Sequence, residues 1–546
     1  MSLVDIRGLH VSLPEGADRP YAVENLSLSI AAGEIVCVVG ESGSGKSISA
    51  RAMMGLLPEP KVRATAGEIV FEGKDLLQMP RPDRRALAGE QLSMIFQEPM
   101  TALNPLMSVG RQIEEVLIVH TTLGPAERRA RVITLLEEVH LPDPPRIIAS
   151  YPHELSGGQR QRAMIAMALI MDPKLLVADE PTTALDVTTQ AQILKLIRDL
   201  QDRHGTGVMF ITHDFGVVAE IAHKIVVMQH GRTVEAGPAD EILSQPQEPY
   251  TRALIRAIPS LTPKPRRASN ERRVLTVGGL EKTYRSRAML GKAQSVAAAK
   301  DVAFTLNRGE TIGVVGESGS GKSTVAKMLV RLLAPDAGQI DLDGIDIALL
   351  SRRQLLAHRS KIQMVFQDPY ASLNPRRKVG DIIAEGPITR GQPAAKARAR
   401  TQELLGLVGL KPEAADRFPH EFSGGQRQRI GLARALAMEP EVLVADEPVS
   451  ALDVSVQAQV LDLLTEIRDR LGLSVVFITH DLRVAAQVCD TIVVMSKGEI
   501  VEHGDVAEVF ANPQHSYTRE LLASIPGRDW VIPTLEDLPM NVALNQ

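Results

Sequence analysis

The sequence predicts an α/β fold made of two consecutive domains, each built on a mostly parallel sheet. Two observations predict this fold. Several motifs occur twice, in the same order, with offsets of 276 residues from Lys46 to Lys322 and 267 residues from Asp179 to Asp446. Short β-branched segments bounded by glycine also alternate with helical patterns, which is typical of parallel sheets. The 546 residues are long enough for two such domains, each with its own core.

The repeated motifs show how closely the two halves correspond. They are GESGSGKS at 40–47 and 316–323, SGGQRQR at 156–162 and 423–429, VADEP at 177–181 and 444–448, and FITHD at 210–214 and 477–481. From the SGGQ motif to Tyr250 and Tyr517 the spacing is identical in both halves. Before it, the first half carries six extra residues before Gln97 and three more before Ser156. Because insertions collect in loops, this pattern indicates two homologous domains.

The secondary structure follows from the hydrophobic patterns. Buried parallel strands are expected at 34–40 and 311–316, at 175–180 and 207–214, and at the second copies of the last two. Residues 190–203 have the three-and-four spacing of a helix. Hairpins are expected at 224–237 and 491–504, and the alternating residues 22–30 predict a small antiparallel sheet.

Composition predicts the domain boundaries. Residues 262–273 are rich in proline, arginine and serine and have no apolar period, so we interpret them as a short exposed linker. The first domain is then 1–261 and the second 274–526. The tail, 527–546, contains the only tryptophan, Trp530, and has no role that the sequence indicates, so disorder is expected there.

Charge and composition exclude several classes of protein. A net charge of −5 gives no support for a broadly basic, nucleic-acid-binding surface. No apolar segment approaches the ~20 residues of a membrane helix, and the N-terminus lacks the features of a secretory signal. The two cysteines, Cys37 and Cys489, are too few for a disulfide framework or a four-cysteine metal site, and we expect both to be buried in a reducing compartment.

The GESGSGKS motif predicts a phosphate-binding loop in each half, because it follows a strand and precedes a helix. Glycines let successive backbone N–H groups point at one phosphate, and the helix N-terminus adds its dipole. Lys46 and Lys322 place a cation on the terminal phosphates, and the hydroxyls of Ser47 and Ser323 are suited to Mg²⁺. The expected nucleotide-binding residues of the loops are Gly40, Glu41, Ser42, Gly43, Ser44, Gly45, Lys46 and Ser47, and Gly316, Glu317, Ser318, Gly319, Ser320, Gly321, Lys322 and Ser323.

Adjacent carboxylates end a strand in each half. We expect Asp179 and Asp446 to hold Mg²⁺ through water, and Glu180 and Glu447 to orient or deprotonate the attacking water. A solvated pair of acids at a strand end is the alternative interpretation. That alternative is disfavoured because a phosphate-binding loop precedes both carboxylate pairs.

A histidine follows the next strand in each half. A histidine in this position is usually structural, but His213 and His480 have the same context in both copies. A neutral imidazole there could donate to the γ-phosphate and sense its loss. We therefore predict a catalytic role for both histidines.

The SGGQ motif adds a second anion-binding edge to each half. Its serine is a good N-cap for the apolar helix that follows, and the exposed N–H groups can bind an anion. A single nucleotide does not need both edges of one domain. We therefore expect each nucleotide to lie between the Walker-type loop of one half and the SGGQ helix of the other.

These motifs together resemble those of ATP-binding cassette (ABC) ATPases over nearly the whole chain. The resemblance adds Q-loop residues Gln97 and Gln367, and D-loops at 183–186 and 450–453 with Asp186 and Asp453. It implies two tandem P-loop ATPase cassettes, each with a parallel core, an antiparallel β subdomain and a helical signature subdomain. The signature residues are Ser156, Gly157, Gly158 and Gln159, and Ser423, Gly424, Gly425 and Gln426.

The same resemblance implies two composite sites that bind ATP and Mg²⁺. Site one would join Lys46, Glu180 and His213 to Ser423; site two would join Lys322, Glu447 and His480 to Ser156. The expected metal-binding residues are Ser47, Gln97 and Asp179 in site one and Ser323, Gln367 and Asp446 in site two. Because both sites keep the glutamate and a full signature, both are expected to hydrolyse ATP. The fused ribose/galactose-type ATPases commonly have one degraded site, so this chain resembles them less.

Two further kinds of segment, each present in both halves, resemble those of the dipeptide/oligopeptide/nickel importer ATPases. They are the Q-loop segments at 96–105 and 366–375 and the C-terminal motifs around Tyr250 with Pro259 and Tyr517 with Pro526. The fused length is similar to that of the single-chain peptide- and glutathione-importer ATPases. Two features depart from the family. Tyr284 is available to stack on adenine in site two, whereas site one has Leu13 at the matching place, and the C-terminal cysteines of relatives with an iron–sulfur cluster are missing, so no cluster is expected.

The resemblance also implies partners and a location. We expect one chain per transporter, forming an intramolecular cassette dimer on two membrane permease subunits, with a periplasmic or extracellular solute-binding protein acting through the permeases. This places the chain peripherally on the cytoplasmic face of the bacterial inner membrane, without nucleic acid. The alternative is a soluble tandem ABC ATPase acting on ribosomes or nucleic acid, which the short linker and acidic charge disfavour. The cargo stays open among peptides, opines, glutathione, nickel and sugar conjugates.

Overall fold

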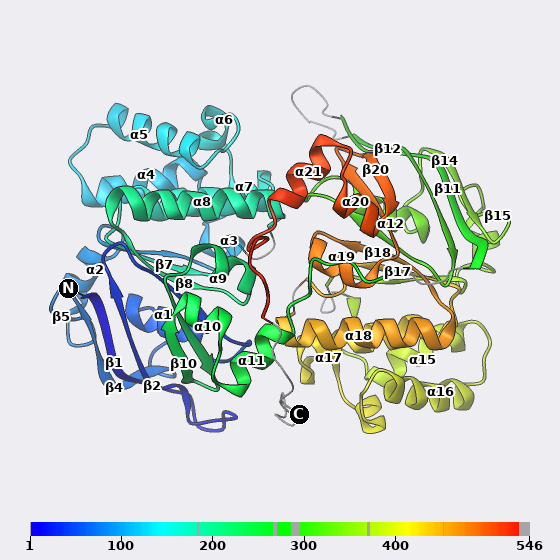
Figure 1. Cartoon of the computed structure of the whole chain (residues 1–546), viewed down its shortest axis with the longest axis horizontal. Coiled ribbons are helices and arrows are strands. Elements are labelled where there is room, and N and C mark those ends of the chain that lie inside the picture. Colours follow the sequence, from blue (N-terminus) through cyan, green and yellow to red (C-terminus); the bar gives the residue numbers. More distant parts are fainter. Residues whose placement is uncertain are drawn as a thin grey trace.

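The two halves of the chain lie side by side in opposite orientations. In the computed structural model, which describes residues 2–182, 185–265, 270–285, 295–368, 372–450 and 452–533, helices α7 and α8 of the first half lie beside α21 of the second (Figure 1). The same view shows α17 and α18 of the second half beside α11 of the first. The helical subdomain of each half therefore lies next to the nucleotide-loop side of the other.

The first half alternates strands and helices as expected. Its strands are β1 (Ser2–Ser12), β2 (Tyr21–Ala31), β3 (Ile35–Val39), β4 (Arg63–Phe71), β5 (Lys74–Asp75), β6 (Leu92–Ile95), β7 (Leu175–Asp179), β8 (Gly207–Ile211), β9 (Lys224–Gln229) and β10 (Arg232–Pro238). Its helices are α1 (Lys46–Met54), α2 (Arg81–Leu87), α3 (Pro99–Ala102), α4 (Val109–His120), α5 (Pro125–Glu138), α6 (Pro144–Ala149), η1 (Pro152–Glu154), α7 (Gly157–Leu169), α8 (Val187–His204), α9 (Phe215–Ile221), α10 (Ala239–Ser244) and α11 (Pro249–Arg256).

The second half repeats this order. Its strands are β11 (Asn270–Arg285), β12 (Ser295–Arg308), β13 (Thr311–Val315), β14 (Ala337–Leu342), β15 (Ile345–Asp346), β16 (Ile362–Val365), β17 (Val442–Asp446), β18 (Ser474–Thr479), β19 (Thr491–Ser496) and β20 (Glu499–Asp505). Its helices are α12 (Lys322–Leu329), α13 (Arg352–Leu355), α15 (Val379–Thr389), α16 (Ala394–Leu407), η2 (Pro412–Asp416), η3 (Pro419–Glu421), α17 (Gly424–Leu436), α18 (Val454–Leu471), α19 (Leu482–Val488), α20 (Val506–Ala511) and α21 (Ser516–Ala523).

Each half contains one parallel and one antiparallel sheet, which confirms the predicted fold class. The six-stranded sheets run β10-β9-β3-β8-β7-β6 and β16-β17-β18-β13-β19-β20, and only the β9–β10 and β19–β20 hairpins in them are antiparallel. The four-stranded antiparallel sheets run β2-β1-β4-β5 and β12-β11-β14-β15. In both halves the strand before the nucleotide loop lies between two parallel neighbours, so the loop emerges from the centre of the sheet.

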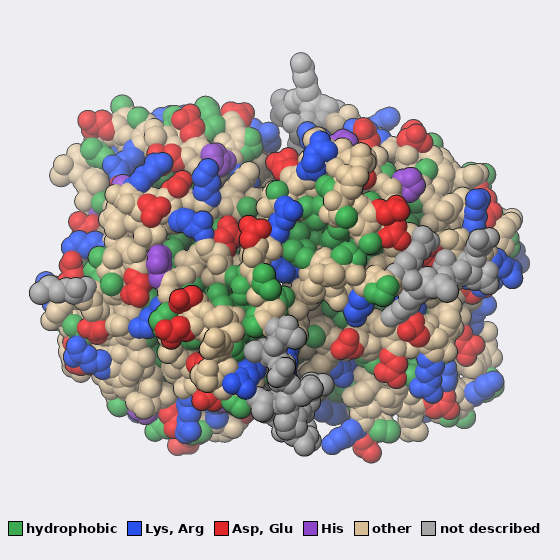
Figure 2. Space-filling model, viewed as in Figure 1, with side chains coloured by type: hydrophobic (Ala, Val, Ile, Leu, Met, Phe, Trp, Pro, Cys, Tyr) green, Lys and Arg blue, Asp and Glu red, His purple; other side chains and the backbone are tan. Residues whose placement is uncertain are grey.

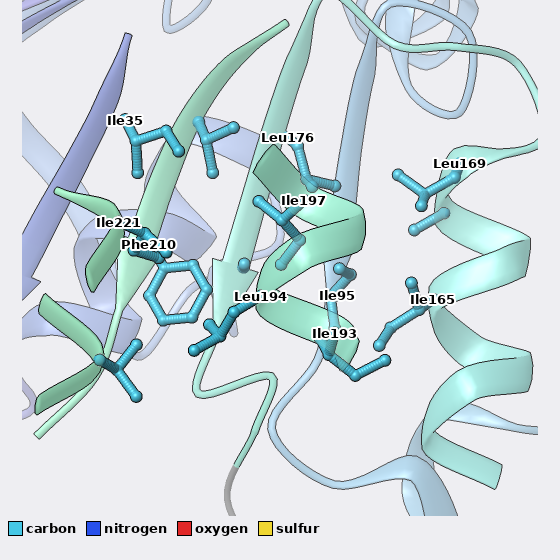
Figure 3. Close-up of a cluster of buried hydrophobic side chains, with 14 of the residues drawn as sticks. Ile35, Ile95, Ile165, Leu169, Leu176, Ile193, Leu194, Ile197, Phe210 and Ile221 are labelled. Atoms are coloured by element: carbon cyan, nitrogen blue, oxygen red, sulfur yellow. The ribbon is translucent and has the colours of Figure 1, made fainter. Parts of the chain in front are cut away.

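Hydrophobic packing explains why these elements hold their places. Every residue of β3 and β7 is buried, as parallel strands covered on both faces require. Helix α8 packs Ile193, Leu194 and Ile197 against Phe210 of β8 (Figure 3). That helix begins after Asp186, whose side chain accepts the Thr189 N–H, and ends at Gly205 in the left-handed conformation, so both ends are capped.

The structure departs from the predicted linker at its end. Strand β11 begins at Asn270, which pairs with Arg308 of β12, so the last four residues of the predicted 262–273 stretch belong to the antiparallel sheet. Backbone pairing with β12 outweighs the poor strand composition there. Residues 266–269 of that stretch and 534–546 of the tail lie outside the described residues.

The C-terminal segment of each half crosses to the other half. The Gln487 amide donates to the carbonyls of Ser260 and Thr262 at 2.7 and 2.9 Å, and Lys264 N–H donates to the Ala486 carbonyl at 3.1 Å. In return Trp530 packs against the core of the first half, so this part of the tail is ordered, contrary to the expected disorder. Figure 2 shows hydrophobic side chains gathered along the middle of the molecule, where the halves meet.

Candidate functional site

The first nucleotide loop is shaped by glycines and by its own lysine. It joins β3 to α1, and Gly40 has a φ of 147°; a Cβ there would lie 2.1 Å from the Met228 carbonyl oxygen. The Lys46 side chain is 5% exposed, and its ammonium donates to the carbonyls of Gly40 and Glu41 at 2.7 and 2.9 Å. Burial lowers the pKa of Lys46, and the nearby acids, led by Asp453 of the other half, oppose that shift.

The second loop has the same geometry between β13 and α12. Gly316 has a φ of 148°, and the Lys322 ammonium donates to the carbonyls of Gly316 and Glu317 at 2.7 and 2.8 Å. Burial lowers the pKa of Lys322, and Glu447 and Asp186 oppose the shift. Both predicted loops therefore have the curled backbone that a phosphate requires.

The first carboxylate of each pair meets the loop serine. Ser47 donates its hydroxyl to Asp179 at 2.8 Å, and Ser323 donates to Asp446 at 3.1 Å. Asp179 is 1% exposed, and burial raises the pKa of both aspartates. The structure thus joins the predicted serine and aspartate of each site as a pair of oxygen donors.

The second carboxylate binds the predicted glutamine and histidine. In site one the Gln97 amide donates to Glu180 at 3.0 Å, and the His213 Nδ1 lies 3.6 Å from the same carboxylate. Glu180 has a φ of 48°, a strained conformation for a non-glycine residue. Strain of this kind concentrates at functional sites, where the surrounding contacts hold it in place.

Site two repeats this triad. The Gln367 amide donates to Glu447 at 2.9 Å, and the His480 Nδ1 lies 3.3 Å from that carboxylate. Glu447 also has a positive φ, 46°. The four predicted catalytic residues and both Q-loop glutamines therefore lie in two matched clusters.

Electrostatics favour the charged form of the histidines. Burial would lower the pKa of His480, but the hydrogen bond and charge of Glu447 outweigh it, and the pKa is raised. Burial would raise the pKa of Glu447, yet His480 and Lys322 lower it. His213 has a raised pKa for the same reasons, with Glu180 as its partner. Each partner glutamate stabilises the protonated form of its histidine, and the neutral imidazole that donates to the γ-phosphate stays a prediction.

A D-loop aspartate and the residues just after both D-loops form hydrogen bonds with the nucleotide loop of the other half. The Ser42 N–H donates to Asp453 of the other half at 3.0 Å, and the Ser455 hydroxyl donates to the Glu41 carboxylate. In the other direction the Thr188 hydroxyl donates to Glu317 at 2.5 Å. Sequence reasoning missed Thr188 and Ser455, although both follow the D-loop aspartates by two residues. Thr183, Ala184 and Ala451 of the D-loops lie outside the described residues.

The signature serines cap their helices as predicted. Ser156 accepts the Gln159 N–H at 3.3 Å and Ser423 accepts the Gln426 N–H at 3.4 Å, and each glutamine side chain accepts the serine N–H in return. The backbone N–H groups of Gly157, Gly158, Gly424 and Gly425 lie in the first turns of these helices.

A cavity of about 650 Å³ lies at site two. Its described lining includes Lys322, Ser323, Gln367, Glu447 and His480 together with Asp186 of the other half. On the signature side it is lined by Gly424 and Gln428 of the same half, and Ser156 to Gln159 are not among the described lining residues. The structure therefore brings the D-loop across to site two, whereas the pairing of Lys322 with Ser156 stays a prediction.

Tyr284 does not line this cavity. It lies on β11, paired with Val296 of β12, and 45% of its surface is exposed. Ala298, two residues along β12 from Val296, does line the cavity. Tyr284 is therefore near the edge of site two, and its stacking on adenine remains a prediction.

The C-terminal tyrosines also reach the nucleotide loops, which sequence reasoning did not predict. The Tyr250 hydroxyl of α11 accepts the Glu41 N–H at 3.1 Å, and the Tyr517 hydroxyl of α21 accepts the Glu317 N–H at 3.0 Å. The identical offset of the YTR and signature motifs between the two halves was the available signal. These tyrosines connect each C-terminal motif to the nucleotide loop of its own half.

Comparison with family models matches both halves. The ABC transporter family matches residues 23–183 and 299–450. The family described as oligopeptide/dipeptide transporter, C-terminal region, matches 234–287 and 501–545, which contain the two tyrosines. Both matches occur twice, as the repeat predicts.

Curated relatives are similar over the whole chain. The peptidoglycan transport ATP-binding protein YejF of Agrobacterium fabrum (strain C58) is 47% identical over 96% of each chain. The glutathione import ATP-binding protein GsiA of Escherichia coli (strain K12) is 43% identical over all of this chain and 93% of its own length. Among solved structures, the dimeric bacterial ABC transporter cassette MJ0796 covers 42% of this chain and 98% of its own, with 30% identity and a TM-score of 0.39.

Proposed function

Because this chain belongs to the ABC transporter ATPase family, and is therefore an ATP-binding and ATP-hydrolysing enzyme, we propose that it is the motor of a membrane importer for peptides or related small solutes. The observation that carries the proposal is the oligopeptide/dipeptide-transporter region that ends each ATPase half. Relatives similar over the whole chain are named for peptidoglycan transport and glutathione import.

The proposal assigns one cassette to residues 1–261 and one to 274–526, and residues 270–273 extend the antiparallel sheet of the second cassette. In each, ATP lies on the nucleotide loop and the D-loop of the other cassette closes over it. The hydrogen bonds from Ser42 to Asp453 and from Thr188 to Glu317 support this arrangement. The signature helices, with Ser423 for site one and Ser156 for site two, complete the sites when ATP draws the halves together.

Each catalytic cluster has a defined division of tasks. Lys46 places its charge on the terminal phosphates, and burial makes that charge act in a medium of low dielectric constant. Glu180 orients the attacking water or takes its proton, held by Gln97 and His213. The imidazole of His213, beside Glu180, donates a hydrogen bond to the γ-phosphate. In site two Lys322, Glu447, Gln367 and His480 have the same tasks.

The residues present fit a magnesium ion. Ser47 and Asp179 offer hydroxyl and carboxylate oxygens 2.8 Å apart, which are the donors this cation prefers, and the Gln97 amide oxygen is a further donor of the right type. Ser323, Asp446 and Gln367 form the matching set. Bound with ATP, the ion would neutralise phosphate charge. An iron–sulfur cluster is not part of the proposal, since the chain has only two cysteines, Cys37 and Cys489, and both are buried.

Membrane partners follow from the family of the relatives. We propose that one chain serves two permease subunits at the inner face of the bacterial cell membrane, with a solute-binding protein delivering the cargo. Among the described helices none is long and apolar enough to cross a membrane. The exposed hydrophobic residues Leu106 and Met100 beside the first Q-loop offer a contact surface for a permease.

Reconstitution tests the proposal. The chain is combined in proteoliposomes with candidate permease and solute-binding proteins from the same organism, and peptide, glutathione and nickel are offered in turn. We expect ATP hydrolysis that peptide-class cargo stimulates, together with uptake of that cargo. A chain that pellets with ribosomes and ignores the membrane subunits would contradict an importer role.

A further inference from the structure

The C-terminal motif of each half places a tyrosine against the nucleotide loop, although the two hydrogen-bonded residues are 200 or more positions apart in the sequence. Tyr250 is 209 residues from Glu41 and Tyr517 is 200 residues from Glu317. Tyr250 is 4% exposed and sits in the first turn of α11, whose Leu254 and Ile255 are also buried. Its position is therefore fixed by packing rather than by the hydrogen bond alone.

The peptide unit that Tyr250 binds is held on several sides. The Glu41 N–H goes to the tyrosine, the Glu41 carbonyl accepts the Lys46 ammonium at 2.9 Å, and the Glu41 carboxylate accepts the hydroxyl of Ser455 from the other half. Glu41 directly follows Gly40, where the loop leaves the strand, so its orientation sets the direction of the N–H groups that follow.

The second half has the same arrangement with different residues. The Tyr517 hydroxyl binds the Glu317 N–H, the Lys322 ammonium binds the Glu317 carbonyl at 2.8 Å, and Thr188 binds the Glu317 carboxylate. The partner from the other half is a serine for one loop and a threonine for the other. The hydroxyl chemistry is kept, which indicates that the hydrogen bond matters more than the packing of the side chain.

We propose that Tyr250 and Tyr517 are positioning residues for ATP, each fixing the second residue of the nucleotide loop in its own cassette. Through the same glutamate the loop is also tied to the D-loop helix of the other cassette. The C-terminal motif is thus part of the catalytic apparatus. The inference rests on the proposed placement of ATP on the two loops.

The test uses the full chain carrying Glu180→Gln and Glu447→Gln, so that ATP binds without turnover, and a fluorescent ATP analogue as the probe. Tyr250→Phe keeps the ring and removes one hydrogen bond. We expect one of the two sites to bind about two- to tenfold more weakly, which is the effect of a single neutral hydrogen bond, with little change in melting temperature. Tyr517→Phe should weaken the other site.

Leu254→Ala is the matched control. It opens a cavity in the same helix and keeps the tyrosine hydroxyl, so it should lower the melting temperature and weaken ATP binding less than Tyr250→Phe does. In otherwise wild-type chains, Tyr250→Phe should raise the KM for ATP more than it lowers kcat. Combined with Ser455→Ala, its effect on affinity should be less than additive, since both act on Glu41.

Two outcomes separate the inference from its premise. If Tyr250→Phe and Tyr517→Phe bind ATP as the parent chain does, while Lys46→Ala and Lys322→Ala each abolish one site, the tyrosines have no positioning role and the inference is wrong. If the lysine variants still fill both sites, the placement of ATP itself is wrong. If Leu254→Ala weakens ATP binding as much as Tyr250→Phe does, the tyrosine acts only through packing.

Discussion

The D-loop aspartates of the two halves occupy equivalent positions and make different contacts. Asp186 accepts the Thr189 N–H and caps its own helix α8. Asp453 leaves α18 without a side-chain cap and accepts the Ser42 N–H of the other half at 3.0 Å. One aspartate stabilises its own cassette, and the other joins the two cassettes. Repeated motifs therefore do not guarantee equivalent sites.

The helices after the histidines differ in a similar way. Gly216 in α9 lets Pro526 of the other half approach, since a Cβ there would lie 2.6 Å from the Pro526 carbonyl oxygen. The equivalent residue in α19 is Arg483, which donates to the carbonyls of Pro526 and Gly527 at 3.0 and 2.9 Å. The end of the second C-terminal motif is therefore held from both sides, by contact with Gly216 and by hydrogen bonds from Arg483.

The glutamates provide the strongest test of whether the sites are equivalent. The double variant Glu180→Gln with Glu447→Gln should lose at least about 100-fold in the rate of ATP hydrolysis, because a positioned base contributes that much or more. It should also trap the closed, ATP-bound chain. The measurement is steady-state phosphate release, with bound nucleotide counted by filtration.

The single variants compare the two sites directly. If the sites hydrolyse ATP equally, Glu180→Gln and Glu447→Gln will have equal effects; a larger loss from one identifies the dominant site. A double variant that hydrolyses ATP at the wild-type rate would show that the carboxylates have been assigned the wrong role.

Substitution of each signature serine by arginine tests whether that serine completes the ATP site of the other half. Ser423→Arg should weaken ATP at the site containing Lys46 by about tenfold or more, or ~1.4 kcal/mol, and Ser156→Arg should weaken the site containing Lys322. The variants are compared in chains that retain only one loop lysine. Unchanged occupancy of the opposite site in the closed chain would argue against the head-to-tail arrangement.

Loss of Asp186 and loss of Asp453 should cause two different defects. Asp186→Ala removes a helix cap and should lower the free energy of unfolding by about 1 kcal/mol. Asp453→Ala removes no cap and should instead weaken ATP-dependent closure by about 0.5–1.5 kcal/mol, the range of one hydrogen bond. Chemical denaturation measures the first effect, and the ATP concentration needed for closure measures the second. Equal stability losses in both variants would remove the distinction.

The residues that the sequence assigned to one site within one half do lie close together. The loop lysines, the serine–aspartate pairs and the glutamate–histidine clusters all depend on strand ends of one sheet, and parallel strands bring those ends together. The same reasoning missed Tyr250, because a tyrosine in an amphipathic helix looks like an ordinary core residue until the helix is docked. It also missed Ser455 and Thr188, which gain their partners only when two separately folded halves meet.

The difference between Asp186 and Asp453 had no signal in the sequence at all. Both follow the same Ala-Leu dipeptide and precede a helix. Which aspartate caps its own helix and which crosses the interface depends on small differences in how the two halves approach. Likewise, no composition rule could place Trp530 in the core of the first half, because that contact depends on the path of the chain after α21.

The smallest expected effect is a change in the pH dependence of stability, which arises from the histidine–glutamate pairs. Because the folded pKa of His480 is raised above its ordinary ~6.5, the pair's contribution to stability is fully present below that pH. It is lost as the pH rises through the raised value.

Glu447→Gln removes the partner and leaves burial as the largest influence on His480, so its folded pKa should fall below 6.5. Stability of this variant should then decrease as the pH falls through 6.5, the opposite sign. Denaturation midpoints between about pH 5.5 and 8.5, compared with those of His480→Gln, isolate this group from other titrating residues. Glu180→Gln tests the same inversion at His213, and a pH profile unchanged in both variants would mean that the glutamates do not set the charge of the histidines.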